Sequence, residues 1–508
     1  MAESRVKNTV RNMFFAIMYQ IITVVLAFAG RKIFVLCLPV EYLGLSGLFG
    51  NLLRILALAE LGFGTAIIYG LYKPIAENDI GKIKSYMRLY KRVYITIGVF
   101  VLTIGAAMIP LLKFFVKEMP NLPGINVNVI FYMFVMQTAI NYFFSYKLQF
   151  VVANQKDYKI KVYEMISTVA MTVSQIVVLF FWKSYYLYLA ISIVVPFIKN
   201  VVATRIIDKE FPFLKEKAEK LPEEDMKKVS KNVMATFLYK VSSTLSATID
   251  TILVSKFMGL TTVGIYYNYH MIIQYCDQFF VIVLGTITPS IGNFFATSDL
   301  KKKNSLFGSL QLVYFWISSY LAVGMVVLFN DFIELWLGKE FLFPQVMVIA
   351  LVASITLTNF QRPCSLLRDA DGLFWYGKFR PLVMIVINVI CSTYLVKNIG
   401  AVGVVWGAVI AKVTTYVWYD PYVVYKYSLK SNVFIYYFKY IMQWILLCGM
   451  CLICWAVYRV IPLHGLPKLV VGFVLITVVV NGIMFVVYRK TEGFDFFKGR
   501  ITGLLKRS

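Results

Sequence analysis

Charged residues are scarce in this 508-residue sequence, and histidines are scarcer still. Asp, Glu, Lys and Arg make up 15% of the chain, against about 25% in an average soluble domain. The two histidines, His270 and His464, have no nucleophile beside them at a spacing that predicts a catalytic pair. The composition therefore argues against a soluble multidomain protein and gives little support to an enzyme.

The seven cysteines predict neither a disulfide framework nor a zinc site, because all of them lie in or next to apolar runs. The closest approach to a ligand spacing is Cys448, Cys451 and Cys454. These three stand in the middle of an apolar run without a nearby histidine, so small-residue packing between helices explains them better. We expect no bound metal and no cofactor.

Long apolar runs dominate the rest of the chain. Hydrophobic residues make up 59% of it and aromatic residues 16%, with a mean hydropathy of +0.72. About 20 apolar residues suffice for a helix to cross a bilayer. Short loops containing Gly, Pro or Asn separate the runs, which predicts an all-α integral membrane protein with about fourteen transmembrane helices. The predicted spans are 13–36, 43–70, 93–112, 127–150, 163–182, 186–206, 233–257, 263–294, 307–329, 345–366, 381–396, 401–425, 433–458 and 467–488.

Positive charge is distributed unevenly over the predicted loops. With a cytoplasmic N-terminus, roughly 38 of the 51 Lys and Arg residues fall on cytoplasmic segments and about 8 on the outer side. This asymmetry predicts that both termini are cytoplasmic. It also accounts for the net charge of +25 without nucleic acid, since basic cytoplasmic edges face anionic lipids.

A weak internal repeat accompanies this pattern. A shift of about 220 residues places Asn12 on Asn232 and Gly44 on Gly264, as in transporters built from two related halves with a site between them. The predicted organisation is a six-helix bundle over 1–206, a polar cytoplasmic linker over 207–231, a second six-helix bundle over 232–430, two extra helices over 431–490 and a basic tail over 491–508.

Charged and polar residues inside the spans are the candidates for function. A charge within a membrane helix costs at least about 2.5–3.5 kcal/mol, so it usually faces a cavity or a partner. For the polar residues the alternative is hydrogen bonding between helices, and for the charged ones a structural ion pair. The candidates are the cations Arg31, Arg54, Lys240 and Lys412, the acids Glu60, Asp250 and Asp277, and the polar residues Gln137, Asn141, Ser243, His270 and Gln274.

The cations suggest an anionic substrate, because Arg and Lys are the residues that hold phosphate. Arg31 could instead extend to the outer surface from near its helix end. The acids either bind a coupling H⁺ or Na⁺ or pair with the cations. Asp250 favours a pair with Arg31 or Arg54. Asp277 favours ion coupling, since only His270 and Gln274 share its face.

Four stretches of the N-terminal half form a distinctive set: 41–49 (EYLGLSGLF), 58–67 (LAELGFGTAI), 69–79 (YGLYKPIAEND) and 153–158 (ANQKDY). With these stretches the chain resembles the bacterial polysaccharide-synthesis flippases of the multidrug/oligosaccharidyl-lipid/polysaccharide exporter superfamily. The resemblance implies a MATE-like fold of two six-helix bundles, with two additional C-terminal helices. It also implies a cationic lumen, for which Arg31, Arg54, Lys240 and Lys412 are the candidates.

The function implied by the resemblance is transfer of a polyprenyl-diphosphate-linked oligosaccharide from the inner to the outer leaflet of the cytoplasmic membrane by alternating access. Such a flippase is a transporter, not an enzyme, and serves synthesis of lipopolysaccharide O-antigen or capsule. The expected partners are the lipid-linked glycan, membrane lipids, a polysaccharide polymerase and chain-length machinery, and the expected state is a monomer in the inner membrane.

Two alternatives stay open. A MATE-type multidrug or cation exporter should have an acidic, aromatic cavity, whereas the charges here lean basic. A membrane polysaccharide polymerase or ligase should have a sizeable outer loop, whereas the predicted outer loops 113–126 and 330–344 are short. The sequence encodes neither the identity of the glycan nor that of the coupling ion in a readable form.

Overall fold

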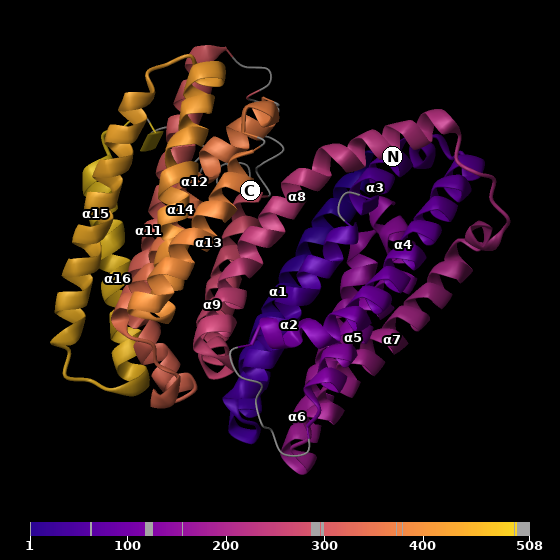
Figure 1. Cartoon of the computed structure of the whole chain (residues 1–508). Coiled ribbons are helices and arrows are strands. Elements are labelled where there is room, and N and C mark those ends of the chain that lie inside the picture. Colours follow the sequence, from indigo (N-terminus) through magenta and orange to yellow (C-terminus); the bar gives the residue numbers. More distant parts are fainter. Residues whose placement is uncertain are drawn as a thin grey trace. The chain divides into compact units, whose positions relative to one another are not determined.

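The computed structural model describes residues 2–60, 63–116, 125–154, 156–285, 295, 299–371, 373–377, 379–491 and 493–494. Throughout this part of the chain the regular secondary structure is helical, which confirms the predicted all-α class (Figure 1). The chain divides into two compact units, Met1–Gly264 and Ile265–Ser508. Each unit is described below by itself.

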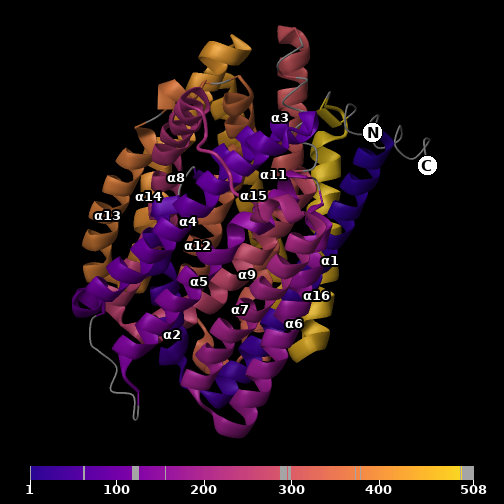
Figure 2. The same ribbon diagram turned by 90° about the vertical axis from the view of Figure 1, so that its right-hand side faces the viewer.

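Long helices packed side by side form the first unit (Figure 2). Its core consists of apolar side chains such as Phe49 and Phe131, both fully buried and in edge-to-face contact at 5.0 Å between ring centroids. α4 packs on α5, and α1 packs on α6. The helices are α1 (Ala2–Cys37), α2 (Val40–Leu56), α3 (Phe63–Glu77), α4 (Ile80–Met108), α5 (Val127–Ala153), α6 (Asp157–Trp182), α7 (Tyr185–Glu210) and α8 (Glu223–Met258).

The predicted span 43–70 is not one continuous helix. α2 ends at Leu56, a 3-10 turn, η1, covers Ala57–Glu60, and α3 begins at Phe63. The described residues contain 11 helices that are long and apolar enough to cross a membrane. The ranges 43–70, 233–257 and 263–294 are not among them, so the total of fourteen spans and the 6+6+2 arrangement stay predictions.

Two short segments of the first unit, 40–44 and 260–264, contact each other in a reciprocal way. A Cβ atom on Gly44 would lie 2.1 Å from the carbonyl oxygen of Leu260, and one on Gly264 would lie 2.5 Å from that of Val40. Such distances exclude any side chain. These glycines correspond under the shift of about 220 residues in the sequence. The two segments therefore pack on one another through their glycines.

Helix α9 (Leu260–Gly285) leads into the second unit, in which α13 packs tightly on α14 and α11 on α12 and α16. A Cβ atom on Gly407 would lie 2.2 Å from the Ser392 hydroxyl, so glycine permits the close approach of α13 to α14. The helices are α11 (Leu300–Trp336), α12 (Gln345–Ala370), α13 (Arg380–Ile399), α14 (Ala401–Val424), α15 (Val433–Arg459) and α16 (Gly465–Tyr488).

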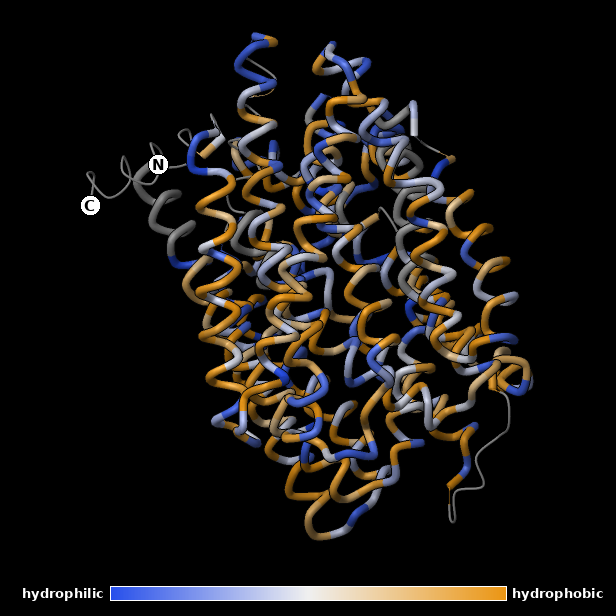
Figure 3. Tube along the Cα trace, turned by 90° about the vertical axis from the view of Figure 1, so that its left-hand side faces the viewer, coloured by the Kyte–Doolittle hydropathy of each residue, from blue (hydrophilic) through white to orange (hydrophobic). Residues whose placement is uncertain are grey.

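Hydrophobic residues predominate along α15 and α16 (Figure 3). Ile445 and Leu452 of α15 and Val478 of α16 are large hydrophobic residues with 59%, 65% and 66% of their surface exposed. Exposed apolar faces of this extent are unfavourable in water and suit contact with lipid. The two compact units divide at Gly264, which is a different division from the predicted one. The predicted domain boundaries at 206, 231 and 430 therefore stay predictions.

Candidate functional site

Glu60 lies at the break between α2 and α3 in the first unit. Its Oε1 accepts a hydrogen bond from the hydroxyl of Tyr94 on α4. That hydroxyl is within 3.5 Å of the Tyr90 hydroxyl, which donates to it. The ring of Tyr142 on α5 packs on Tyr94 at 5.8 Å between centroids. Within the described residues no cation forms an ion pair with Glu60, and its described hydrogen-bond donor is a phenol group.

The close approach of Tyr94 to Glu60 depends on Gly64. A Cβ atom at this position would lie 2.6 Å from the Tyr94 hydroxyl and 3.6 Å from Oε1 of Glu60. Any side chain larger than hydrogen would displace the hydroxyl from the carboxylate. The turn η1 and Gly64 thus hold the carboxylate of Glu60 against Tyr94 at the break between α2 and α3.

Asp277 of α9 has a charged partner that the sequence analysis did not identify. The guanidinium of Arg362 on α12 donates from Nη2 to Oδ1 of Asp277 at 2.6 Å and from Nε to Oδ1 of Asn359 at 2.8 Å. The side chains of Asp277 and Arg362 are 27% and 25% exposed. Asp277 therefore acts as a counter-charge in this structure, while its predicted role in ion coupling stays a prediction.

Lys412 of α14 is bound to neutral oxygens of α12. Its ammonium group donates to the carbonyl oxygen of Ser354 at 2.9 Å, to the Ser354 hydroxyl at 2.8 Å and to the Thr358 hydroxyl at 3.1 Å. Three donors with three acceptors satisfy the hydrogen-bonding capacity of an ammonium group. This arrangement favours an interhelical link over a freely available substrate ligand.

The other predicted cations lie in the first unit. Arg54, in the last turn of α2, is exposed, and within the described residues it forms no ion pair. Arg31 of α1 is half-buried. The side chain of Lys240 lies outside the described part of α8, as does that of Ser243. Among the candidate cations whose side chains are described in the first unit, Arg54 is therefore the most accessible to an anion.

Among the polar candidates, Asn141 of α5 makes the interhelical hydrogen bond that the alternative interpretation describes. Its Oδ1 accepts from Nδ2 of the buried Asn200 on α7 at 3.2 Å. The backbone carbonyl oxygen of Gln137 accepts a hydrogen bond from Nδ2 of Asn141 at 3.1 Å. His270 stacks on Tyr266 at 5.7 Å between ring centroids. Gln274 and Asp250 are half-buried, and their predicted roles are unchanged.

A buried charge network in the second unit escaped the sequence analysis. Asp420 of α14 is fully buried, and its Oδ2 lies 3.0 Å from Nη1 of Arg368 and 2.8 Å from Nη1 of Arg380. The pattern of positive charge had assigned both arginines to the cytoplasmic edge. Arg368 is buried, with 4% of its surface exposed. The network joins α12, α13 and α14, and the only available signal was an aspartate inside the predicted span 401–425.

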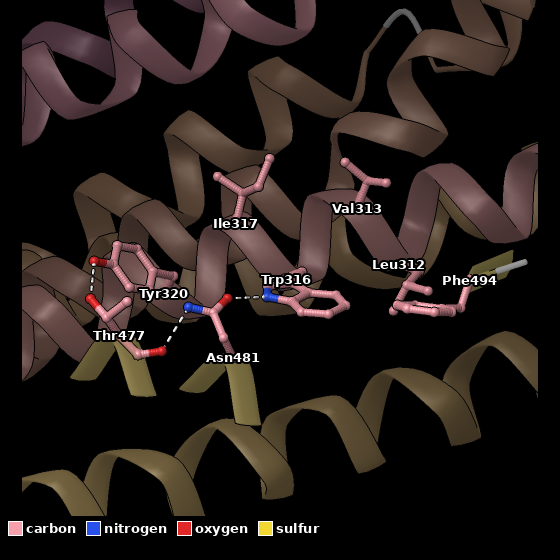
Figure 4. A pocket seen from close by; sticks show the side chains of 8 residues that line it. All are labelled: Leu312, Val313, Trp316, Ile317, Tyr320, Thr477, Asn481 and Phe494. Atoms are coloured by element: carbon pink, nitrogen blue, oxygen red, sulfur yellow. Dashed lines mark hydrogen bonds between the residues drawn. The ribbon is translucent and has the colours of Figure 1, made fainter. Parts of the chain in front are cut away.

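A groove of about 470 Å³ runs between α11 and α16 (Figure 4). Trp316 donates from Nε1 to Oδ1 of Asn481 at 2.8 Å, and the hydroxyls of Tyr320 and Thr477 are 2.9 Å apart. These bonds pair the polar groups of the lining with one another and leave the walls largely apolar. They also attach α16, the last of the long helices that the structure describes, to α11.

The described residues contain no group of three or more His, Cys, Asp or Glu side chains that could hold a metal ion. The described acids and cations lie at a helix break and between helices, which is where membrane transporters place such residues.

Solved structures of transporters share this fold. The lipid II flippase MurJ, in an inward closed conformation, aligns with a TM-score of 0.64 at 13% identity, over 94% of this chain and 98% of MurJ. An inward-facing MATE family multidrug resistance transporter of the MOP superfamily aligns with a TM-score of 0.61 at 15% identity, over 79% and 94%. A MOP superfamily transporter from Pyrococcus furiosus aligns with a TM-score of 0.53 at 14% identity, over 84% and 97%.

These likenesses show that the chain has the fold of MurJ and the MATE transporters. Together with the 11 described helices that are long and apolar enough to cross a membrane, they support a multi-pass integral membrane protein. Residues 9–295 match the family described as polysaccharide biosynthesis protein. The match spans more than half of the chain, and the protein belongs to this polysaccharide biosynthesis protein family. No curated protein matches the sequence significantly. The resemblance drawn from the sequence is confirmed.

Proposed function

We propose that this protein is a flippase for a polyprenyl-diphosphate-linked oligosaccharide. It transfers the lipid-linked glycan from the inner to the outer leaflet of the bacterial cytoplasmic membrane by alternating access, for a surface polysaccharide such as O-antigen or capsule. The observation that carries this proposal is the match of residues 9–295 to the polysaccharide biosynthesis family. The similarity of the fold to that of a lipid II flippase supports it.

The chemistry of the first unit supports an anionic substrate. Arg54 is exposed, and the described residues provide no carboxylate for it. A guanidinium group binds phosphate oxygens through two parallel hydrogen bonds. Arg31 and Lys240 are the further cations proposed for the diphosphate and for acidic sugars. Lys412 contributes less, because α12 already satisfies its ammonium group.

The proposal includes a membrane orientation and an energy source. Both termini lie in the cytoplasm, as the excess of Lys and Arg on one side of the predicted topology indicates. A coupling H⁺ or Na⁺ binds at the acids Glu60, Asp250 or Asp277. The lipid tail stays in the bilayer during transfer, and the polymerase and chain-length machinery receive the glycan on the outer side.

One observation favours the second candidate, a MATE-type exporter of drugs or cations. Glu60 accepts a hydrogen bond from Tyr94, which contacts Tyr90 and Tyr142, and within the described residues it forms no ion pair. Aromatic faces and a carboxylate are the groups that hold organic cations. The fold of the MATE transporters agrees with this candidate. The accessible Arg54 and the family match favour the flippase.

Depletion of the protein from its own host tests the proposal. Without the flippase, the lipid-linked glycan should accumulate in the cytoplasmic leaflet, where lectins applied to intact cells do not reach it, and surface polysaccharide should disappear. Expression of the wild-type chain should restore both. Normal surface polysaccharide after depletion, together with raised sensitivity to cationic drugs, would favour the exporter instead.

A further inference from the structure

Helix α7 of the first unit has an exposed apolar face that becomes cationic toward the C-terminal end of the helix. Val194, Ile198 and Val202 follow one another at steps of four residues and are 50%, 54% and 44% exposed. Arg205 and Lys209 continue the same face at helical spacing and are also exposed. Because α7 is long and apolar enough to cross a membrane, this face suits the acyl chains of a lipid followed by its headgroup.

Lys199 lies beside this face, about 16 Å before the end of α7. It is half-buried, and the charges of Glu164 and Lys161 on α6 act on it. Glu164, however, accepts a hydrogen bond from Lys161 at 2.8 Å, and within the described residues no carboxylate forms an ion pair with Lys199. A charge inside a membrane helix is costly without a partner. Together with Arg205 and Lys209, Lys199 forms a set that we call the α7 cations.

The acids at the end of α7 are bound to other lysines. Asp208 forms an ion pair with Lys147 at 2.6 Å. Glu210 forms ion pairs with Lys156 at 2.9 Å and with Lys159 at 2.7 Å. In the part of the chain that the structure describes, neither acid is paired with any of the α7 cations. Three positive charges therefore stand on one side of α7 without a described counter-charge, and the complementary occupant is an anion.

We propose that Lys199 and Arg205 bind the phosphate group of an acidic glycerophospholipid, such as phosphatidylglycerol, in the cytoplasmic leaflet. Their backbones are about 9 Å apart along the helix axis, and both long side chains can extend to one phosphate between them. Arg holds phosphate oxygens as a planar fork and Lys as a point charge. The acyl chains lie along the apolar face, and Lys209 faces the rest of the headgroup. Acidic phospholipids are the anions that the membrane itself supplies at this depth.

This lipid site goes beyond the proposed function, because it needs neither a glycan nor transport. The test is the binding of phosphatidylglycerol to the purified, delipidated full-length protein in detergent. A ligand that binds only the folded state raises the melting temperature with its concentration, which gives an apparent affinity. We expect phosphatidylglycerol to bind about tenfold more tightly than phosphatidylethanolamine, whose net charge is zero.

Substitutions at Lys199 separate a specific site from diffuse attraction between a basic surface and anionic lipid. Lys199→Gln should weaken the apparent affinity for phosphatidylglycerol about tenfold, whereas Lys199→Arg keeps the charge and should retain most of it. Lys73→Gln is the matched control, because Lys73 is a lysine of α3 whose side chain is 82% exposed, and it should leave the affinity unchanged. An equal loss in Lys199→Gln and Lys73→Gln would show diffuse attraction only and overturn the proposal.

The melting temperature without added lipid gives a result that a merely structural role would not produce. Lys199→Gln removes a charge that lacks a partner in the delipidated protein, so its melting temperature should be equal to or above that of the wild type. A lower melting temperature would show that Lys199 instead holds α7 to α6 through Glu164, which would overturn the proposal. Equal affinity for the two phospholipids, or wild-type affinity in Lys199→Gln, would overturn it as well.

Two further probes distinguish the possible sources of the phosphate group. Inorganic phosphate has no acyl chains for the apolar face and should not reproduce the rise in melting temperature. A polyprenyl diphosphate should not displace phosphatidylglycerol at equal concentration. If it does displace the phospholipid, and Lys199→Gln abolishes its binding, the site belongs to the substrate lipid and the proposal of a phospholipid site is wrong. A normal phosphatidylglycerol response in a protein that moves no lipid-linked glycan would contradict the proposed function and leave the lipid site standing.

Discussion

Replacement of Asp420 by asparagine should remove most of the protein from the membrane. Asp420 is fully buried and balances two arginines, Arg368 at 3.0 Å and Arg380 at 2.8 Å. Loss of one member of a buried ion pair costs about 3–5 kcal/mol, because it leaves an uncompensated buried charge. That is a large share of a typical stability of about 5–15 kcal/mol. Abundance in isolated membranes and the midpoint of thermal unfolding measure the effect.

Asp369→Asn is the matched control for this substitution. Asp369 accepts hydrogen bonds from the same Arg368 at 3.0 and 2.9 Å, but its side chain is 45% exposed. An exposed pair contributes at most about 1 kcal/mol, so the variant should remain abundant and stable. Equal abundance and equal melting temperature of the two variants would show that the network around Asp420 does not hold α12, α13 and α14 together.

Replacement of Arg54 by alanine should abolish surface polysaccharide at normal protein abundance. Arg54 is exposed, and an exposed substitution away from structural contacts changes stability by about 0.5 kcal/mol or less. Its proposed bonds to the diphosphate are charge-assisted, and each is worth about 1.5–3 kcal/mol. Substrate affinity should therefore fall roughly tenfold to a hundredfold. Surface polysaccharide and accumulated lipid-linked precursor measure the loss.

Charge and geometry can be separated at this position. Arg54→Lys keeps the charge without the planar fork and should retain part of the activity. Lys73→Ala removes a lysine whose side chain is 82% exposed and should leave transport intact. Lys412→Ala should act chiefly on stability, since it breaks three hydrogen bonds to α12. Wild-type polysaccharide output from Arg54→Ala at normal abundance would exclude Arg54 from the substrate path.

The long apolar helices could be predicted from the sequence, because lipid requires a helix of a certain length and composition, and both can be recognised within a single stretch of the chain. The family could be inferred from stretches such as 41–49 and 58–67. The break at Ala57–Glu60 could not be predicted, because Glu60 accepts a hydrogen bond from Tyr94, which lies 34 residues further along the chain. Hydropathy alone extends the helix through such a turn.

Charge partners were equally hard to foresee. Asp277 binds Arg362, 85 residues away, and Asp420 binds Arg368, 52 residues away. A count of Lys and Arg near predicted helix ends assigns these arginines to the cytoplasmic edge, since the rule records charge and not burial. Lys412 was identified as a cation within a span, but its bonds to Ser354 and Thr358 depend on how α14 packs against α12.

The most direct test of the central claim is flipping in vesicles. The purified protein is reconstituted with a fluorescent polyprenyl-diphosphate-linked oligosaccharide, and a membrane-impermeant reagent reports how much of the glycan lies in the outer leaflet over time. The account predicts that the wild-type protein equilibrates the lipid between leaflets, that Arg54→Ala slows this to near the rate of empty vesicles, and that Lys73→Ala matches the wild type. A wild-type rate equal to that of protein-free vesicles, in preparations that remain folded, would contradict it.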